Sequence, residues 1–141
     1  MYLASYWDAV SRAQGCMLGQ LAGDSLGSLV EFQSPEEIQR AYPCGVNELE
    51  DGGTWGTIAG QPTDDSEMAL ALAHTLIREG TYDPEAVRSA YVAWLESKPF
   101  DCGNTVGGGL RGNLNPESQA NGALMRVSPL GIFGANYSLE Q

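Results

Sequence analysis

A hydroxyl and two adjacent carboxylates stand where a glycine-rich stretch of the sequence gives way to a helical pattern. Thr63, Asp64 and Asp65 offer three hard oxygen ligands, which suit Mg²⁺ or Mn²⁺ rather than zinc. At a helix N-terminus, the partial positive charge of the backbone would keep both carboxylates ionised before any metal arrives. The same tripeptide also makes an ordinary helix cap with an acidic first turn, so by itself it leaves both interpretations open.

A second pair of carboxylates lies earlier in the chain, on either side of an expected glycine turn. Asp24 lies within residues 23–27, Gly-Asp-Ser-Leu-Gly, and Glu31 lies in the Val-Glu-Phe segment that follows. Carboxylates held on both sides of one turn are candidates for substrate binding and for acid–base work. Taken alone, Glu31 fits a solvated glutamate just after a helix better than a catalytic group.

Two later segments, rich in glycine and asparagine, could approach a ligand through their backbone. Residues 101–105, Asp-Cys-Gly-Asn-Thr, lead into a glycine triplet at 107–109, whose exposed N–H groups could bind phosphate oxygens without a lysine. Asn121 could hydrogen-bond a ribose or a phosphate, and Gly122 would allow close backbone approach. Glycine triplets and Asn-Gly pairs are also ordinary turns, so neither segment alone indicates a ligand.

Two other kinds of catalytic chemistry find no support. His74 is the only histidine, and it lies in the middle of an expected helix beside the apolar face, so a serine-hydrolase mechanism lacks a base. The glycine triplet has no P-loop lysine after it, which argues against nucleoside triphosphatase chemistry.

The charge balance restricts the partners. The chain has 18 acidic and 7 basic residues and a net charge of −11, so its surface repels nucleic acid and anionic membranes. A diphosphate-bearing substrate would have to be attracted by metal ions and backbone N–H groups. No apolar run reaches the roughly 20 residues that span a bilayer, and the start has no basic region before an apolar core, so we expect neither a membrane segment nor a secretory signal.

The cysteines indicate a reducing compartment. Cys16, Cys44 and Cys102 are an odd, widely spaced set without a CxxC pair. This pattern fits small, buried, reduced side chains better than disulfides or a zinc site. We therefore expect a cytoplasmic protein.

The elements that must position these residues are expected to be helices. The first begins near Ser5, with Asp8 as its capping partner, and carries an apolar stripe at spacings of three and four. The stripe consists of Tyr6, Val10, Ala13, Met17 and Leu21. Glycines recur every four residues at positions 15, 19, 23 and 27, which predicts close approach of a neighbouring helix or a ligand.

Start and stop signals mark further helices. One helix begins at Ser34-Pro35 and ends by Pro43. A second runs from about Asp64 to Glu79, with Gly80 as the stop. A third begins at Asp83-Pro84 and ends before Pro99. The buried stripes are Met68, Leu72, Thr75 and Leu76, then Val87, Tyr91, Trp94 and Leu95. Residues 44–62 and 100–122 are glycine-rich and are expected to be irregular; long loops of this kind are usually functional.

The end of the chain is expected to be helical as well. Residues 123–133 are apolar enough for a buried helical segment, broken near Pro129. Residues 138–141 resemble the capped start of another helix, as if the chain were cut there. Convincing strand patterns are few. The sequence therefore predicts an all-α protein with one domain over residues 1–141.

Taken together, these segments resemble the ADP-ribosylglycohydrolase family, which has bacterial and eukaryotic members. Four motifs match in order: GDSLGSLVEF at 23–32, PTDDSEM at 62–68, DCGNT at 101–105 and NGALMRVSPLGIFG at 121–134. Each motif alone is unremarkable, whereas the ordered set is specific and spans nearly all of residues 12–135.

The resemblance implies an orthogonal helical bundle that holds two divalent ions, Mg²⁺ or Mn²⁺, over the distal ribose of ADP-ribose. It implies that Thr63, Asp64 and Asp65 are metal ligands, and that Asp64, Asp65 and Glu31 are catalytic, with Glu31 near the scissile bond as base or gate. The residues implied in substrate binding are Asp24, Gly103, Asn104, Thr105, Gly107, Asn121, Gly122 and Met125.

The sequence departs from the family pattern in one respect. The family's second metal cluster, an Asp-x-Asp-Thr/Ser run late in the chain, has no counterpart, because no aspartate follows Asp101. Family members are also much longer. The resemblance therefore implies an incomplete bundle that is inactive alone, and either poorly stable or associated with a second chain that supplies the missing half.

For the complete enzyme, the resemblance implies hydrolysis that removes ADP-ribose from a modified protein. The ions would stabilise charge as the anomeric bond breaks, and an aspartate or Glu31 would act as general base. Two other functions stay open: a module that binds ADP-ribose without cleaving it, and an interaction protein, such as an immunity factor, that blocks an ADP-ribosylating toxin. The sequence does not distinguish Mg²⁺ from Mn²⁺ or identify the acceptor side chain.

Overall fold

The fold is helical throughout the part of the chain that the computed structural model describes, residues 2–137. Its helices are α1 (Tyr2–Gly27), α2 (Pro35–Ala41), α3 (Asp64–Glu79), α4 (Pro84–Glu96), α5 (Asn104–Leu110) and α6 (Ser128–Phe133), with 3₁₀ turns at Asn121–Ala123 and Gly134–Asn136. Within the described residues, the one extended pairing is an isolated bridge between Gly52 and Thr57. The predicted all-α class is confirmed.

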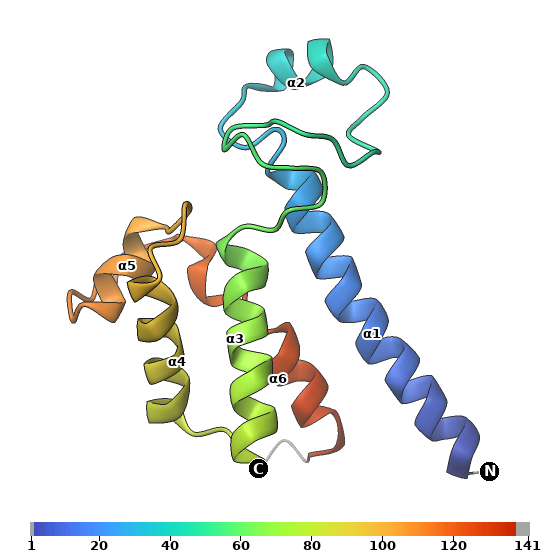
Figure 1. The fold of residues 1–141 in the computed structure, drawn as a ribbon, viewed down its shortest axis with the longest axis vertical. Coiled ribbons are helices and arrows are strands. Elements are labelled where there is room, and N and C mark those ends of the chain that lie inside the picture. The colour runs from blue at the N-terminus through green and yellow to red at the C-terminus, as the bar shows by residue number, and fades with distance from the viewer. Residues whose placement is uncertain (1, 138–141) are drawn as a thin grey trace.

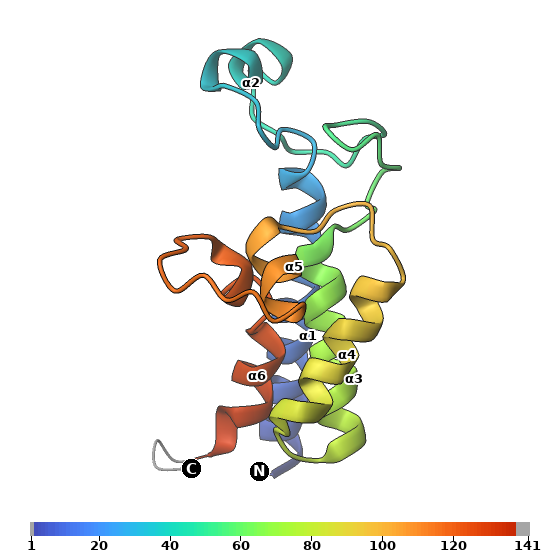
Figure 2. The ribbon, with the colours of Figure 1, turned by 90° about the vertical axis from the view of Figure 1, so that its left-hand side faces the viewer.

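The core surrounds α3. This helix lies beside α4 on one side and α6 on the other, and α5 covers the upper end of α4 (Figures 1 and 2). The buried cluster consists of Met68, Leu72, Leu76, Val87, Tyr91 and Val106. Burying each of these large side chains stabilises the fold by roughly 1.5–3 kcal/mol. The stripe predicted for α3 is buried as expected, and that of α4 is buried at Val87 and Tyr91 and half-buried beyond them.

The predicted helix ends of α2, α3 and α4 are confirmed by their caps. Ser34 makes a capping box with Glu37 at the start of α2. Gly80 ends α3 in the left-handed conformation, with φ of 67°, which glycine adopts without a steric cost. The Asp83 carboxylate accepts bonds from the first backbone N–H groups of α4, 2.9 and 3.1 Å away.

The first helix differs from the prediction at both ends. It begins at Tyr2 and already contains Ser5, so Ser5 is not its cap. It also continues through residues 23–27, where a glycine turn was expected, and the turn follows at 28–32 instead. The glycines at 15, 19, 23 and 27 show no close helix approach, since a Cβ on any of them would meet nothing within 4 Å of it.

The late segments differ as well. The expected loop at 100–122 contains α5, in which the glycines at 107–109 are helical because Val106 anchors the segment in the core. The apolar segment 123–133 is interrupted at Val127, close to Pro129 as expected, and Pro129 then lies in the first turn of α6, where a proline costs no backbone bond. Cys16 and Cys44 are exposed, contrary to expectation, and all three cysteines are free thiols. The predicted helix start at 138–141 lies outside the described residues.

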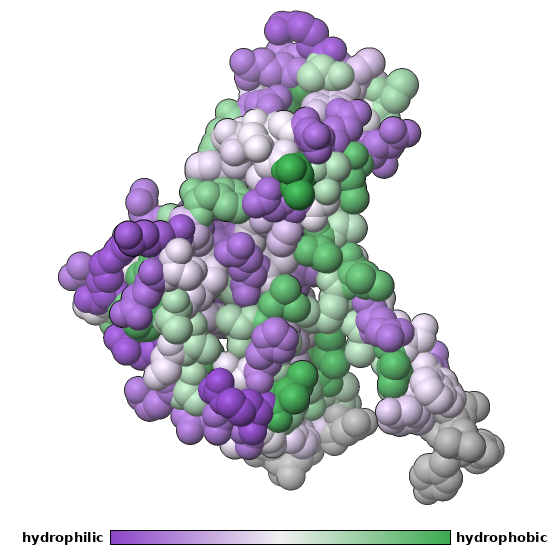
Figure 3. Space-filling view, in the orientation of Figure 1, coloured by the Kyte–Doolittle hydropathy of each residue, from purple (hydrophilic) through white to green (hydrophobic). Residues whose placement is uncertain are grey.

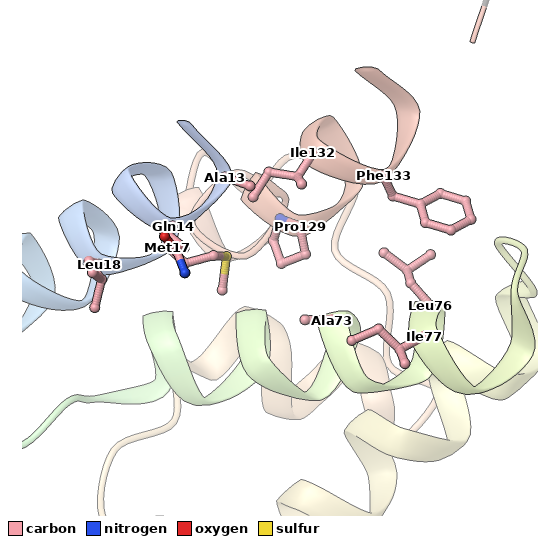
Figure 4. Close-up of a pocket in the computed structure, with 10 residues that line it drawn as sticks. All are labelled: Ala13, Gln14, Met17, Leu18, Ala73, Leu76, Ile77, Pro129, Ile132 and Phe133. Carbon is pink, nitrogen blue, oxygen red and sulfur yellow. The ribbon is translucent and has the colours of Figure 1, made fainter. Parts of the chain in front are cut away.

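The long helix α1 contacts the body of the molecule along a groove. Its predicted stripe is only half-buried from Val10 to Leu21, and Tyr6 is exposed. The groove, of about 530 Å³, is almost wholly apolar and is lined by Ala13, Gln14, Met17, Leu18, Ala73, Leu76, Ile77, Pro129, Ile132 and Phe133 (Figure 4). Figure 3 shows hydrophobic residues gathered along this side of α1 and α3. None of the described helices is both long and apolar enough to cross a membrane.

Candidate functional site

The last turn of α1 caps the first turn of α3. The Asp24 carboxylate accepts hydrogen bonds from the backbone N–H of Thr63 at 3.0 Å, from the Thr63 hydroxyl at 2.6 Å and from the Ser66 N–H at 3.1 Å. These N–H groups have no partner inside the helix, and their dipoles favour a negative charge. Thr63 itself gives no side-chain cap. A residue remote in sequence therefore fixes the segment Thr63–Asp65, and the structure gives Asp24 a positioning role.

Gln20 joins three segments beneath the site. Its side-chain amide donates to the backbone carbonyl of Asp65 at 3.0 Å and to that of Met125 at 2.8 Å. Thus α1, α3 and the segment around Asn121–Ala123 hold a fixed relation to one another. The Gln20 carbonyl oxygen is buried and without a partner among the described protein groups.

A loop from the glycine-rich segment 44–62 holds Glu31. Gly53 lies so close to the turn at residues 28–32 that a Cβ would come within 2.7 Å of the Leu29 Cα. The Thr54 hydroxyl donates to the Glu31 carbonyl, and the Trp55 indole N–H donates to the Glu31 carboxylate at 2.7 Å. The long loop therefore positions an acidic side chain.

Two adjoining pockets collect the predicted residues. One, of about 350 Å³, is lined by Gly23, Asp24, Gly27, Ser28, Glu31, Thr63, Asp65 and Asn121. The other, of about 360 Å³, is lined by Glu31, Phe32, Asp64, Asp65, Asp101, Gly103, Asn104, Thr105, Val106, Ala120, Asn121, Gly122 and Met125. Because Glu31, Asp65 and Asn121 line both, we treat the two as one acidic cleft. It lies where the C-terminal end of α1 meets the N-terminal ends of α3 and α5 (Figure 1).

Gly107 is the one predicted site residue that does not line the acidic cleft. It is buried inside α5, where its N–H donates to the Gly103 carbonyl at 2.9 Å and its α-carbon faces Cys102 and Arg111. The expectation that the glycine triplet exposes free N–H groups on a loop is therefore wrong at this position. Close packing explains this glycine, since a Cβ would lie 3.0 Å from the Arg111 guanidinium.

The carboxylates of the acidic cleft repel one another. Burial, followed by the charges of Asp24 and Asp64, raises the pKa of Asp65 to about 6. Burial, followed by the charges of Asp64 and Glu31, raises the pKa of Asp101 to about 7. Perturbed carboxyl groups of this kind cluster at functional sites. Asp101 was missed as a site residue, although it opens the motif at 101–105 and so could have been found there.

The oxygen donors fit part of a site for a divalent cation. The group contains only hard oxygen ligands, and its mutual repulsion would be relieved by a bound cation. The number of donors falls short, however: across residues 2–137, no three histidine, cysteine, aspartate or glutamate side chains are grouped closely enough to hold a metal ion. Thr63, Asp64 and Asp65 have the right donor chemistry for such a cation but do not complete a site by themselves.

Comparison with known proteins places these motifs in one family. A family model described as ADP-ribosylglycohydrolase matches residues 7–141. The chain is 39% identical to the ADP-ribosyl-[dinitrogen reductase] glycohydrolase of Rhodospirillum rubrum, over 86% of this chain and 44% of that protein. It is 33% identical to the ADP-ribosylarginine hydrolase Tri1 of Pseudomonas putida (strain GB-1), over 89% of this chain and 37% of that protein. The chain therefore spans less than half the length of these curated relatives.

Proposed function

This chain belongs to the ADP-ribosylglycohydrolase family, and on that premise we propose that it forms part of an enzyme that hydrolyses the bond between ADP-ribose and a protein side chain. One observation supports the proposal most directly. Residues from four motifs, far apart in the sequence, line a single acidic cleft. If each motif made only a helix cap or a turn, the four motifs would not need to line the same cleft.

We propose that the acceptor side chain is arginine. The name of the Pseudomonas putida relative states that it acts on ADP-ribosylarginine. The acidic cleft suits a cationic guanidinium group, since four carboxylates line the larger pocket and no lysine or arginine lines either pocket.

We propose that Thr63, Asp64 and Asp65 hold one side of a Mg²⁺ site, with Mn²⁺ as the alternative ion. When bound, the ions would orient the ribose hydroxyls and lower the pKa of the water that attacks the anomeric carbon. The chain's own contribution is to hold these ligands in place: Asp24 fixes Thr63, and Gln20 fixes the Asp65 backbone. Two ions in the complete enzyme would require donors beyond these three residues.

The remaining residues of the acidic cleft divide between proton transfer and binding. One oxygen of Glu31 accepts the Trp55 N–H, which leaves the other oxygen to take a proton from the attacking water. Asp101, with a pKa raised to about 7, is a second candidate for the proton acceptor. Asn104, Thr105 and Asn121 offer donors and acceptors to the ribose and diphosphate, and Met125 adds an apolar wall.

We propose that catalysis requires polypeptide beyond these 141 residues. The relatives are more than twice as long as the part that the chain matches. Such a segment, in the same chain or a second one, would cover the apolar groove along α1. It would also supply the metal donors that are missing among the described residues. On this proposal the 141 residues alone do not turn over substrate.

Complementation tests this function. The 141-residue chain is mixed with the part of the Rhodospirillum rubrum relative that it does not match, and release of ADP-ribose from an arginine-modified protein is measured. We expect release from the mixture and none from either part. Asp64→Asn should abolish release, whereas Glu36→Gln, a matched loss of charge on the exposed face of α2, should leave it unchanged. Ile77→Glu, at a groove residue that is 79% exposed, should prevent assembly.

Two outcomes would contradict the proposal. Wild-type release by the Asp64→Asn mixture would remove the metal and catalytic assignments. A stable complex, shown by sedimentation, that releases nothing from arginine-, serine- or other modified proteins would favour a binding module instead.

A further inference from the structure

An exposed aromatic ring stands at the edge of the acidic cleft in an unfavourable backbone conformation. Phe32 has a φ of 62°, in the left-handed region that bulky side chains rarely adopt. Its side chain is 80% exposed, so burial in the core does not offset this strain. Strained residues of this kind concentrate at sites that hold a ligand. The position of Phe32 therefore calls for a function outside the fold's own stability.

Phe32 is the first of three aromatic rings that pack in a row. Trp55 meets it edge to face, with ring centroids 6.3 Å apart, and Phe100 packs against Trp55 at 6.1 Å. Trp55 is fixed in turn by its hydrogen bond to Glu31. Three separate loops thus build one aromatic rim, defined as Phe32, Trp55 and Phe100. The rim is held in place before any ligand arrives.

The charge beside the rim selects the ligand. Phe32 lines the same pocket as Glu31, Asp64, Asp65 and Asp101, and that pocket has no basic residue in its lining. An aromatic face beside carboxylates attracts a planar cation, which stacks on the ring and donates hydrogen bonds in its plane. A guanidinium group meets both conditions. Beside Phe32 a phosphate gains no basic partner, a lysine ammonium is not planar, and a neutral base gains nothing from the carboxylates.

We propose that the aromatic rim recognises the guanidinium group of the acceptor arginine, which stacks on Phe32 beside the carboxylates of the acidic cleft. This inference rests on the proposed function, since it names the residues that select the acceptor for that reaction. Glu31 is not among the proposed metal ligands, so its charge stays available when a cation occupies the site. Phe32 is thereby a specificity residue that contacts the leaving group rather than the ribose.

Titration calorimetry on the 141-residue chain separates this proposal from the proposed function. The probes are ADP-ribose, ADP-ribosylarginine and ADP-ribosylserine, each with Mg²⁺. We expect ADP-ribosylarginine to bind more tightly than the other two. Phe32→Ala should weaken ADP-ribosylarginine by about fivefold, as expected for the loss of a partly exposed cation–π contact. The same substitution should leave ADP-ribose and ADP-ribosylserine unchanged.

Matched variants distinguish stacking from bulk. Phe32→Tyr keeps the ring and should retain the preference, whereas Phe32→Leu keeps an apolar side chain without a π face and should lose it. Circular dichroism confirms that each variant is folded, which is expected because the side chain is exposed.

Three outcomes would overturn the inference. Equal weakening of all three probes by Phe32→Ala would show that the ring binds the adenine base or the ribose. Retention of the preference by Phe32→Leu would exclude stacking. Equal affinity of the wild-type chain for the three probes would show that the rim does not read the acceptor. If ADP-ribose itself does not bind the folded wild-type chain, the failure lies with the proposed function. N-acetyl-arginine amide, titrated alone, then tests the aromatic rim. The inference is overturned if this probe does not bind, or if Phe32→Ala does not weaken its binding.

Discussion

At the scale of single residues, Asp24 shows how the cleft is held together. Its carboxylate occupies the N-terminus of α3 and accepts a bond from the Thr63 hydroxyl, so it joins the end of one helix to the start of another. Both N–H donors belong to buried residues, Thr63 and Ser66. The charge of Asp24 is therefore used for positioning.

Asp24→Ala should lower the free energy of unfolding by about 2 kcal/mol, because it removes a cap and leaves buried N–H groups unpaired. Urea denaturation followed by circular dichroism measures the change. Asp83→Ala, which removes an exposed cap from α4, is the control and should cost about 1 kcal/mol. An Asp24→Ala variant no less stable than the Asp83→Ala variant would show that Asp24 does not anchor α3.

Asp101 should make the fold less stable as the pH rises. Its pKa is raised to about 7, so the folded state holds the proton more tightly than the unfolded state. The stabilisation is then complete below the ordinary carboxyl pKa and is lost as the pH rises through 7. Asp101→Asn should remove this loss and make the chain more stable than wild type at pH 8 by about 1 kcal/mol, a value reduced by solvent screening of the open cleft.

Urea denaturation at pH 5 and pH 8 checks this sign. Near pH 5 the advantage of Asp101→Asn should be smaller than at pH 8, because the folded wild-type chain still holds the proton there and only the unfolded chain is largely ionised. A variant that gains as much stability at pH 5 as at pH 8 would contradict the raised pKa.

At the scale of elements, what could be predicted from the sequence was local. The ends of α3 and α4 follow from Asp83, Pro84 and Gly80, which act on their own neighbours, and the stripe of α3 follows from its spacing. Long-range contacts could not be read in this way. No local signal shows that Asp24 caps a helix 39 residues later, or that packing of Val106 into the core makes α5 helical despite its glycines.

The site was predicted through its motifs rather than its geometry. Motifs in a familiar order identified the residues that line the acidic cleft, with Gly107 as the exception. Asp101 and Phe32 stood inside these motifs, but their roles depend on neighbours from other segments. The repulsion that raises the pKa of Asp101 and the strained φ of Phe32 exist only in the folded chain.

The loop that carries Trp55 offers a test at this scale. Gly53 and Gly80 both have positive φ, but only at Gly53 would a Cβ meet backbone, 2.7 Å from the Leu29 Cα. Gly80→Ala should therefore cost about 1 kcal/mol for the left-handed conformation alone. Gly53→Ala should in addition displace the loop and break the Trp55–Glu31 bond.

Indole fluorescence reports this displacement, because freeing the Trp55 N–H from Glu31 and exposing the ring should shift the emission to longer wavelength. Gly80→Ala should leave the emission unchanged. Identical emission spectra for the folded Gly53→Ala and Gly80→Ala chains would show that Gly53 does not hold Glu31 in place.

At the scale of the whole molecule, a compact body carries one long, half-covered helix and one acidic cleft. The groove along α1 is almost wholly apolar, whereas the acidic cleft is polar and charged. The first is suited to polypeptide and the second to a small ligand. The chain thus presents both the surfaces expected of a portion of a larger glycohydrolase, and its relatives are more than twice as long as the region it matches.

The central claim is that the acidic cleft is one part of an ADP-ribose site, and titration of ADP-ribose into the folded 141-residue chain tests it most directly. With Mg²⁺ present, we expect saturable binding that is lost in EDTA and in the Asp64→Asn variant, and retained in Glu36→Gln. Binding that is equally strong in EDTA and in Asp64→Asn would contradict the metal assignment. No binding under any condition, by a chain shown folded by circular dichroism, would show that these residues do not form the site by themselves.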